Sequence, residues 1–170
     1  MRKASVVLVG ILLMIVSFQS AWAQKEKYHS IFIYNFSRYV KWPDAQSSGI
    51  FVIGVLGKSA IQKDLETMAT TKRANGMSIE IKNFSSIEEI QNCHILYVST
   101  SESDKMEHVV SSTQNQSILI VTDNPGLAQK GAAINFVEVD GKIKFELNQQ
   151  NAEVRGLKVA GSLASLAILV

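Results

Sequence analysis

The amino-acid sequence predicts an α/β sandwich, in which helices cover a mostly parallel sheet and a β-hairpin extends one edge. Strand-like apolar runs alternate with helix-like stretches from 50 to 122, and this alternation is typical of a doubly wound parallel sheet with right-handed crossovers. Asp140-Gly141 then lies between two extended runs. An Asp-Gly pair in this position is among the strongest short signals for a β-hairpin.

The first residues have the pattern of a secretion signal. Arg2 and Lys3 precede an uncharged apolar run, and Ala21-Trp22-Ala23 fits the small-residue cleavage site. We therefore expect a signal peptide over 1–23, cleavage after Ala23, and one exported domain over 24–170. An uncleaved membrane anchor is the alternative, although the apolar run is somewhat short for a spanning helix.

The charge of the expected mature chain excludes one class of partner. Without Arg2 and Lys3, the remaining basic residues equal the 15 acidic ones in number, and they form no cluster. A neutral chain without a basic patch is not typical of proteins that bind nucleic acid.

The one cysteine, Cys93, cannot form a disulfide within the chain. It is therefore either buried or able to pair with a second chain.

The segment from Tyr28 to Pro43 is predicted to be an aromatic helix that ends at Trp42-Pro43, because a residue before proline is disfavoured in a helix. Two neighbouring lines of side chains form one apolar stripe at helical spacing. These lines are Tyr28, Phe32, Phe36 and Val40, and beside them Ile31, Asn35 and Tyr39. Two interpretations stay open. The helix packs on the sheet with a hydrogen-bonded Asn35 in the core, or Tyr34, Asn35, Tyr39 and Trp42 also line a pocket or partner surface.

Strands and helices are expected to alternate along the rest of the chain, after a linker at Asp44–Gly49. Buried strands are predicted at Ile50–Leu56, His94–Val98 and Ser117–Thr122, with a further strand around Ile79 and Ile81 after an Asn75-Gly76 turn. Helices are predicted after Ser59 as N-cap, after Ser85 or Ser86, around Met106–Val110, and around Leu127. The hairpin joins Ala133–Val139 to Lys142–Leu147, Asn148 begins a helix that stops at Gly156, and a last helix covers Gly161–Leu169.

Polar residues follow the buried strands at the edge where parallel sheets bind ligands. Backbone N–H groups before helix starts suit an anion there. The candidate ligand-binding residues are Gly57, Lys58, Ser59, Ser101, Asp123 and Asn124. The simpler interpretation of the same residues is helix capping. The segment is not a P-loop, because the position that requires the first glycine is Val52.

The sequence contains no recognisable catalytic set. No G-x-S-x-G motif is present. Cys93 and His94 are adjacent, but the other histidines, His29 and His108, lie on different segments, and a zinc site needs three or four ligands at workable spacing. We therefore predict no enzyme, no metal and no cofactor.

Several short motifs, in this order and behind a signal peptide, resemble the YfiR-like family over about Lys27 to Ala167. They are Tyr34-Asn35-Phe36 with Tyr39, Trp42 and Pro43; Phe51–Gly57; Asn75-Gly76; Cys93–Leu96; Thr122–Gly126; Ile134-Asn135; Phe145–Asn148; and Gly156–Val159. The resemblance implies a periplasmic, non-enzymatic regulator with a Rossmann-like three-layer sandwich. It also implies a partner, because the best-known member binds the periplasmic part of a membrane-bound diguanylate cyclase, YfiN, and keeps it inactive.

The resemblance further implies site residues. Phe145, Glu146 and Asn148 match an FE-x-N strip near the partner-contact region, and Tyr39 and Trp42 match the aromatic motif. With Tyr34 added, we expect Tyr34, Tyr39, Trp42, Glu146 and Asn148 to contact the partner, a diguanylate cyclase or a histidine kinase. The best-known member is dimeric and redox-sensitive through disulfides, but Cys93 alone cannot provide such a switch within one chain. A homodimer, a modulating small ligand and a free-standing ligand-binding protein remain open alternatives.

Overall fold

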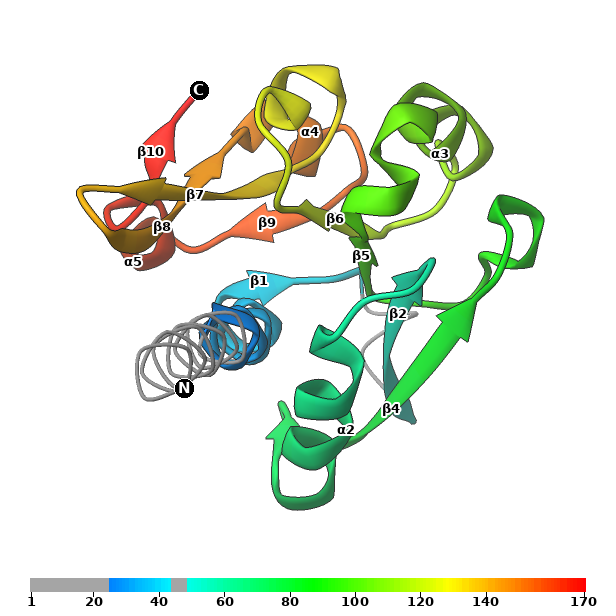
Figure 1. Ribbon diagram of the computed structural model, residues 1–170. Helices are drawn as coiled ribbons and strands as arrows, with labels where there is room; N and C mark the ends of the chain where they lie inside the picture. Colours follow the sequence, from blue (N-terminus) through cyan, green and yellow to red (C-terminus); the bar gives the residue numbers. More distant parts are fainter. Residues whose placement is uncertain (1–24, 44–48) are drawn as a thin grey trace, which may run out of the picture.

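The computed structural model describes residues 25–43 and 49–170. The expected signal peptide with its cleavage site, and nearly all of the expected linker at 44–49, lie outside these residues. The described chain forms a curled, eight-stranded sheet with helices on its faces, which confirms the predicted α/β class (Figure 1). A separate two-stranded antiparallel sheet joins β1 (Val40–Lys41) to β9 (Lys158–Val159).

The large sheet is mostly parallel. Its strands, as they lie side by side, are β10 (Ile168–Leu169), β8 (Lys142–Leu147), β7 (Ile134–Val139), β6 (Leu119–Thr122), β5 (Ile95–Val98), β2 (Ile50–Leu56), β4 (Met77–Phe84) and β3 (Arg73–Ala74). Only the β7–β8 and β3–β4 pairs are antiparallel. Because β2 lies between β4 and β5, the direction of winding reverses between β2 and β5. This reversal is the topological switch point at which such sheets bind ligands.

Two hydrophobic cores lie on opposite faces of the sheet, as the alternation along β2 requires. Phe51, Ile53 and Val55 belong to the first core, whereas Val52 and Leu56 belong to the second. The first core packs under the N-terminal helix (25–39) and α2 (Ile61–Thr71), with α4 (Gln149–Glu153) and α5 (Gly161–Ala164) at its far end. The second packs under η2 (Ile87–Glu89), α3 (Met106–Ser112) and η4 (Leu127–Lys130), with η3 (Thr100–Lys105) leading into α3. The three layers of the predicted sandwich are therefore present.

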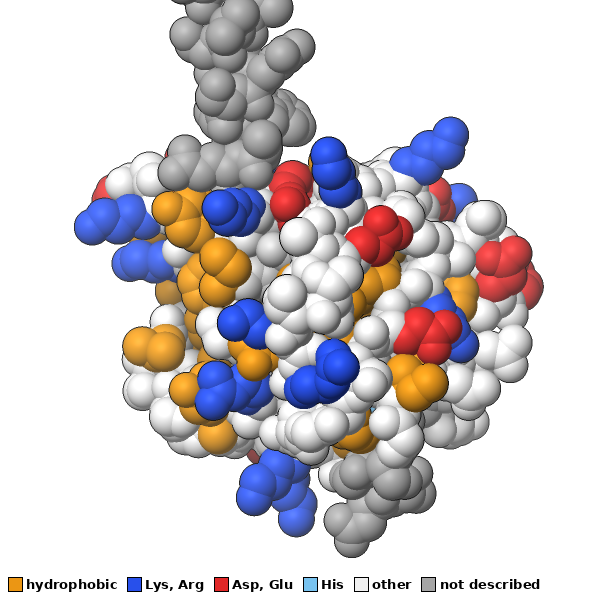
Figure 2. All heavy atoms as spheres, turned by 90° about the horizontal axis from the view of Figure 1, so that it is seen from below, with side chains coloured by type: hydrophobic (Ala, Val, Ile, Leu, Met, Phe, Trp, Pro, Cys, Tyr) orange, Lys and Arg blue, Asp and Glu red, His pale blue; other side chains and the backbone are white. Residues whose placement is uncertain are grey.

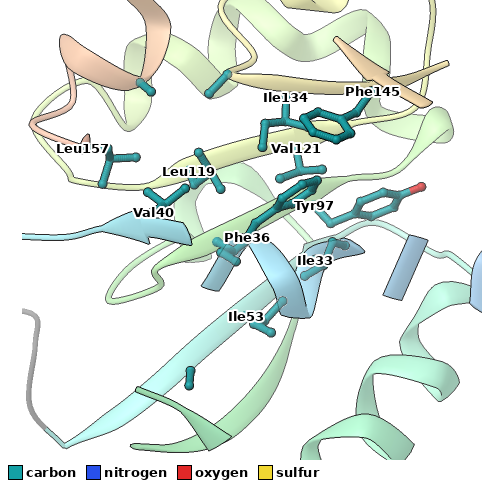
Figure 3. Packing of buried hydrophobic residues seen from close by; sticks show 14 of the residues in the cluster. Ile33, Phe36, Val40, Ile53, Tyr97, Leu119, Val121, Ile134, Phe145 and Leu157 are labelled. Atoms are coloured by element: carbon teal, nitrogen blue, oxygen red, sulfur yellow. The ribbon is translucent and has the colours of Figure 1, made fainter. Parts of the chain in front are cut away.

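The N-terminal helix packs on the sheet, but its buried stripe is rotated from the predicted one. Ile33, Phe36 and Val40 are fully buried, and Phe36 faces the sheet near Phe145 (Figure 3). The predicted second line is not buried, since Ile31 is 47% and Tyr39 is 40% exposed. The helix also ends earlier than predicted, because Val40 and Lys41 pair with β9. This pairing gives their backbone groups partners that a further helical turn would have supplied.

The C-terminal end departs further from the sequence prediction. The expected helix over Gly161–Leu169 stops at Ala164, and Ile168–Leu169 instead form β10, parallel to β8. The Val170 N–H donates to the Leu147 carbonyl at 3.2 Å. An outer hairpin strand leaves backbone groups unpaired, and a short final strand satisfies some of them. The hairpin therefore does not form the edge itself.

The two Asx-Gly turns behave as their sequences predict. Asp140 and Gly141 have φ values of 53° and 69°, and Asn75 and Gly76 have φ values of 50° and 87°. Positive φ at both central residues is the requirement of the tight hairpin turn that Asn-Gly and Asp-Gly favour. The Asn75-Gly76 turn joins β3 to β4 in a small hairpin.

Arg155, just after α4, holds the end of α3. Arg155 is 6% exposed, and its guanidinium donates to the Thr113 carbonyl at 2.8 Å, with longer contacts to the carbonyls of Val110 and Gln116. Replacing it by methionine is expected to lower the free energy of unfolding by about 2 kcal/mol, because buried carbonyls lose charged donors. Urea denaturation checks this prediction. Arg38→Met, on the exposed face of the N-terminal helix, is the control, and equal losses in the two variants would contradict the prediction.

Candidate functional site

The predicted ligand edge forms a cleft at the switch point. Gly57, Lys58, Ser59 and Ser101 line a cleft of about 680 Å³ at the carboxyl ends of β2 and β4, next to η3, which follows β5. The other lining residues are Ala60, Gln62, Asn83, Phe84, Ser85 and Glu102. The structure therefore brings these four predicted residues together. Asp123 and Asn124 do not line this cleft, and the Asn124 amide instead donates to the Ser103 hydroxyl at 2.8 Å.

Gly57 lines this cleft at a position that only glycine fits. Its φ is +77°, and a Cβ atom at this position would lie 2.6 Å from Glu102 Cγ and from Ser99 Oγ. A side chain would therefore both strain the backbone and collide with η3. The prediction of Ser59 as N-cap is wrong, because Ala60 occupies that position of α2; the Ser59 hydroxyl only accepts a long hydrogen bond from the Ile61 N–H at 3.4 Å. The cleft presents a lysine, a glutamate and several hydroxyl groups to solvent, which suits a polar ligand.

Asp123 lies in a second, smaller pocket of about 300 Å³ under the start of the described N-terminal helix. The pocket is lined by Lys25, His29, Asp123, Pro125, Phe136, Val137, Glu138 and Ile143. Lys25 Nζ lies 3.4 Å from Asp123 Oδ2, and the Thr100 hydroxyl donates to Asp123 Oδ1 at 2.9 Å. The His29 ring stacks on the Phe136 ring, with the two centroids 4.0 Å apart and 4° between the planes.

Burial shifts the pKa values of the titratable side chains in and beside this second pocket. His29 is 1% exposed, and burial lowers its pKa to about 4 despite the opposing effect of Asp123. Burial, together with repulsion from Asp123, raises the pKa of Glu26. The same two causes raise the pKa of the Tyr97 phenol, at the end of β5. At neutral pH, His29 is therefore an uncharged imidazole beside acidic groups.

The sequence analysis did not identify Lys25, Glu26 and His29 as site residues. Lys25 and His29 share a line with Ile33 at i, i+4 spacing, so a polar start to a buried stripe was the available signal. The predicted stripe began at Tyr28 instead, and this choice placed His29 on the wrong side. Tyr28 is 46% exposed, whereas His29 is buried.

The predicted partner residues on the N-terminal segment have different surroundings. Tyr39 is 40% exposed, and Tyr34 is half-buried, with Lys72 Nζ 5.8 Å from its ring centroid. Trp42 is a core residue at 8% exposure, and its Nε1–H donates to the His94 carbonyl at 3.1 Å. Figure 2 views the molecule from the side of the N-terminal helix and α2, and it shows hydrophobic side chains among Lys and Arg side chains on this face. Of the three, Tyr39 offers the most surface to a partner.

Glu146 and Asn148 face the opposite side of the sheet from these aromatic residues, since Phe145 and Leu147 occupy the first core. Glu146 is half-buried, and the fully buried Asn135 amide donates to its carboxylate at 2.9 Å. Asn148 caps α4 by accepting from the Asn151 N–H at 3.1 Å. The structure therefore does not bring the five predicted partner residues into one patch. It keeps Glu146 and Asn148 together and places Tyr34, Tyr39 and Trp42 on the other face.

Cys93 is buried, which is one of the two alternatives that the sequence left open for this residue. Its side chain is fully buried in the second core, and burial raises the pKa of its thiol to about 12. A buried, protonated thiol is poorly reactive.

Within residues 25–43 and 49–170, no group of three His, Cys, Asp or Glu side chains is arranged to hold a metal ion. No helix in the same part of the chain is long and apolar enough to cross a membrane.

Comparisons with known proteins extend this description. The family described as YfiR/HmsC-like matches residues 26–168. Among solved structures, an ABC domain from Streptococcus pneumonia in complex with L-Trp has a similar fold, with a TM-score of 0.51 and 16% sequence identity. The match covers 71% of this chain but only 55% of that chain, so this chain spans little more than half of it. No curated protein sequence matches the chain.

Proposed function

Because the chain belongs to the YfiR/HmsC-like family, we propose that it is a periplasmic regulator that docks on a membrane signalling protein and represses it. Membership of this family supports a non-catalytic role in regulating a membrane signalling protein. The proposed partner is the periplasmic part of a diguanylate cyclase or of a histidine kinase. The proposed acting form is 24–170 after removal of 1–23. A ligand or a second copy of the chain would bias the docked state.

The match over residues 26–168 carries this proposal, and the environment of Glu146 supports a place for docking. The Thr122 hydroxyl donates to Asn135 Oδ1 at 2.8 Å, and the Asn135 amide donates to Glu146 Oε2 at 2.9 Å. This chain of hydrogen bonds fixes a half-buried carboxylate at the end of β8. A pre-oriented charge loses little conformational entropy when a partner binds it. Asn148 lies beside it as a second polar contact, whereas Tyr39, on the other face, would belong to a separate contact surface.

Charge reversal at Glu146 tests the proposal. We expect Glu146→Lys to abolish repression when the chain is expressed with its partner cyclase, measured as a rise in cellular cyclic di-GMP. Glu146→Gln is expected to weaken repression while keeping an acceptor for Asn135, so that it separates charge from fold. Glu80→Lys is the matched control, because Glu80 is a half-exposed acid on β4, near the other edge of the sheet. Normal repression by Glu146→Lys would contradict this docking site.

A second candidate function is a free-standing periplasmic small-molecule-binding protein. The observation that favours it is the cleft at the switch point, which Gly57, Lys58, Ser59 and Ser101 line. The docking function requires a membrane protein as partner, whereas the ligand-binding function does not. If deletion of the chain leaves cyclic di-GMP and kinase output unchanged, and no membrane protein is retained on the purified chain, the ligand-binding function is favoured.

A further inference from the structure

The pocket beneath the described start of the N-terminal helix lies beside buried polar atoms that lack hydrogen-bond partners. Both ring nitrogens of His29 and the Oε2 atom of Glu26 are buried, and none of them has a partner within 25–43 and 49–170. Leaving a buried polar group unsatisfied is costly, and such groups in proteins normally bond to protein, water or a ligand. His29 lines the pocket itself. An occupant of the pocket that forms hydrogen bonds would therefore give His29 a partner that the described chain does not supply.

The charges around the pocket indicate which kind of molecule fits. Asp123 and Glu138 line the pocket, and Glu26 is close enough to Asp123 to repel it. Among the lining residues that the structure describes, Lys25 is the one cation, and it is already paired with Asp123. Acidic groups thus outnumber basic ones, so the site favours a cation over an anion. The uncharged His29 imidazole offers one donor and one acceptor, and a hydroxyl group can pair with one of the two.

We propose that this pocket binds a small organic amine that also carries a hydroxyl group. The ammonium group pairs with Asp123 and Glu138, the hydroxyl bonds to His29, and the carbon skeleton packs against Phe136, Val137 and Ile143. A volume of about 300 Å³ is at the lower end of the range for ligand pockets, which limits the ligand to a small metabolite. The proposal goes beyond the docking function and names a ligand class for the regulator, but binding itself needs no partner.

Calorimetric titration of the purified chain tests the proposal with three named amines, ethanolamine, putrescine and glucosamine. Ethylene glycol and glucose, which lack the amine, are the matched probes. We expect ethanolamine or glucosamine to bind, putrescine to bind more weakly because it has no hydroxyl group, and the two uncharged probes not to bind. Asp123→Asn should weaken amine binding by about tenfold or more, because a charged hydrogen bond is lost. Glu138→Gln, at the exposed rim, is a second variant with a smaller expected loss.

Glu80→Gln on β4 is the control variant and should bind the amines like the parent chain. Equal binding by Asp123→Asn and Glu80→Gln would overturn the proposal. Binding of none of the three amines would also overturn it and would leave water as the occupant of the pocket. Because no partner is present in the titration, its failure would not affect the docking function, which the Glu146 variants test separately.

Discussion

Replacing Phe36 by alanine is expected to lower the free energy of unfolding by about 3 to 5 kcal/mol. Phe36 is fully buried on the N-terminal helix, and its ring centroid lies 5.3 Å from that of Phe145 and 5.9 Å from that of Phe136 (Figure 3). Truncation removes both ring contacts and leaves a cavity between the helix and the β7–β8 hairpin. Guanidinium denaturation, followed by tryptophan fluorescence and by circular dichroism, measures the loss.

Tyr39→Ala provides the comparison on the same helix. Tyr39 is 40% exposed, and surface substitutions usually change stability by about 0.5 kcal/mol or less. We therefore expect a small effect from this variant and a large one from Phe36→Ala. If both variants lost the same free energy, the helix would not be held on the sheet by the Phe36 face, and the pocket beneath its first turns would not be fixed either.

The central sheet could be predicted from sequence because local signals agree there with the tertiary structure. Ile50–Leu56 is predicted with the bounds of β2, and Asp140-Gly141 forms the turn between β7 and β8. Long apolar runs and Asp-Gly turns are set by nearby residues, so no distant contact is needed to recognise them. The end of the chain is different. Ile168–Leu169 became a strand because the outer side of β8 offers unpaired backbone groups, and the sequence around 168 does not contain that information.

The candidate sites also contain residues that could be predicted from local sequence and residues that could not. The cleft residues Gly57 and Ser59 follow a recognisable strand, so their place at the switch point could be predicted. Arg155 and His29 could not be assigned roles, because their surroundings come from residues far along the chain. Arg155 contacts Thr113, and His29 stacks on Phe136. The partner residues were predicted by resemblance, and resemblance did not indicate that the sheet would separate Tyr39 from Glu146.

The stability of the protein is expected to fall as the pH is lowered from about 6.5 to about 4, because His29 is buried in its neutral form. The pKa of His29 is lowered to about 4 in the folded state, whereas a histidine in an unfolded chain titrates near 6.5. Between these values the unfolded chain binds a proton that the folded chain does not. Protonation therefore favours unfolding, by on the order of 3 kcal/mol across the whole window. The contribution is fully present above about pH 6.5.

Three other charged groups in or beside the pocket affect the stability in the same pH window, so a difference measurement is required. Lys25 further lowers the His29 pKa and Asp123 raises it, while Glu26 contributes with the opposite sign. The pKa of Glu26 is raised in the folded state, so its ionisation destabilises the fold as the pH rises, and acidification relieves this cost.

Denaturation of the parent chain and of His29→Phe across this pH range separates the contribution of His29 from that of Glu26. Phenylalanine retains the stack on Phe136 but cannot titrate. We expect the parent to lose more stability than the variant on acidification, whereas His108→Gln, on an exposed part of α3, should follow the parent. Parallel curves for the parent and His29→Phe would mean that His29 can be protonated in place. Its burial beside Phe136 would then not exclude the charged ring.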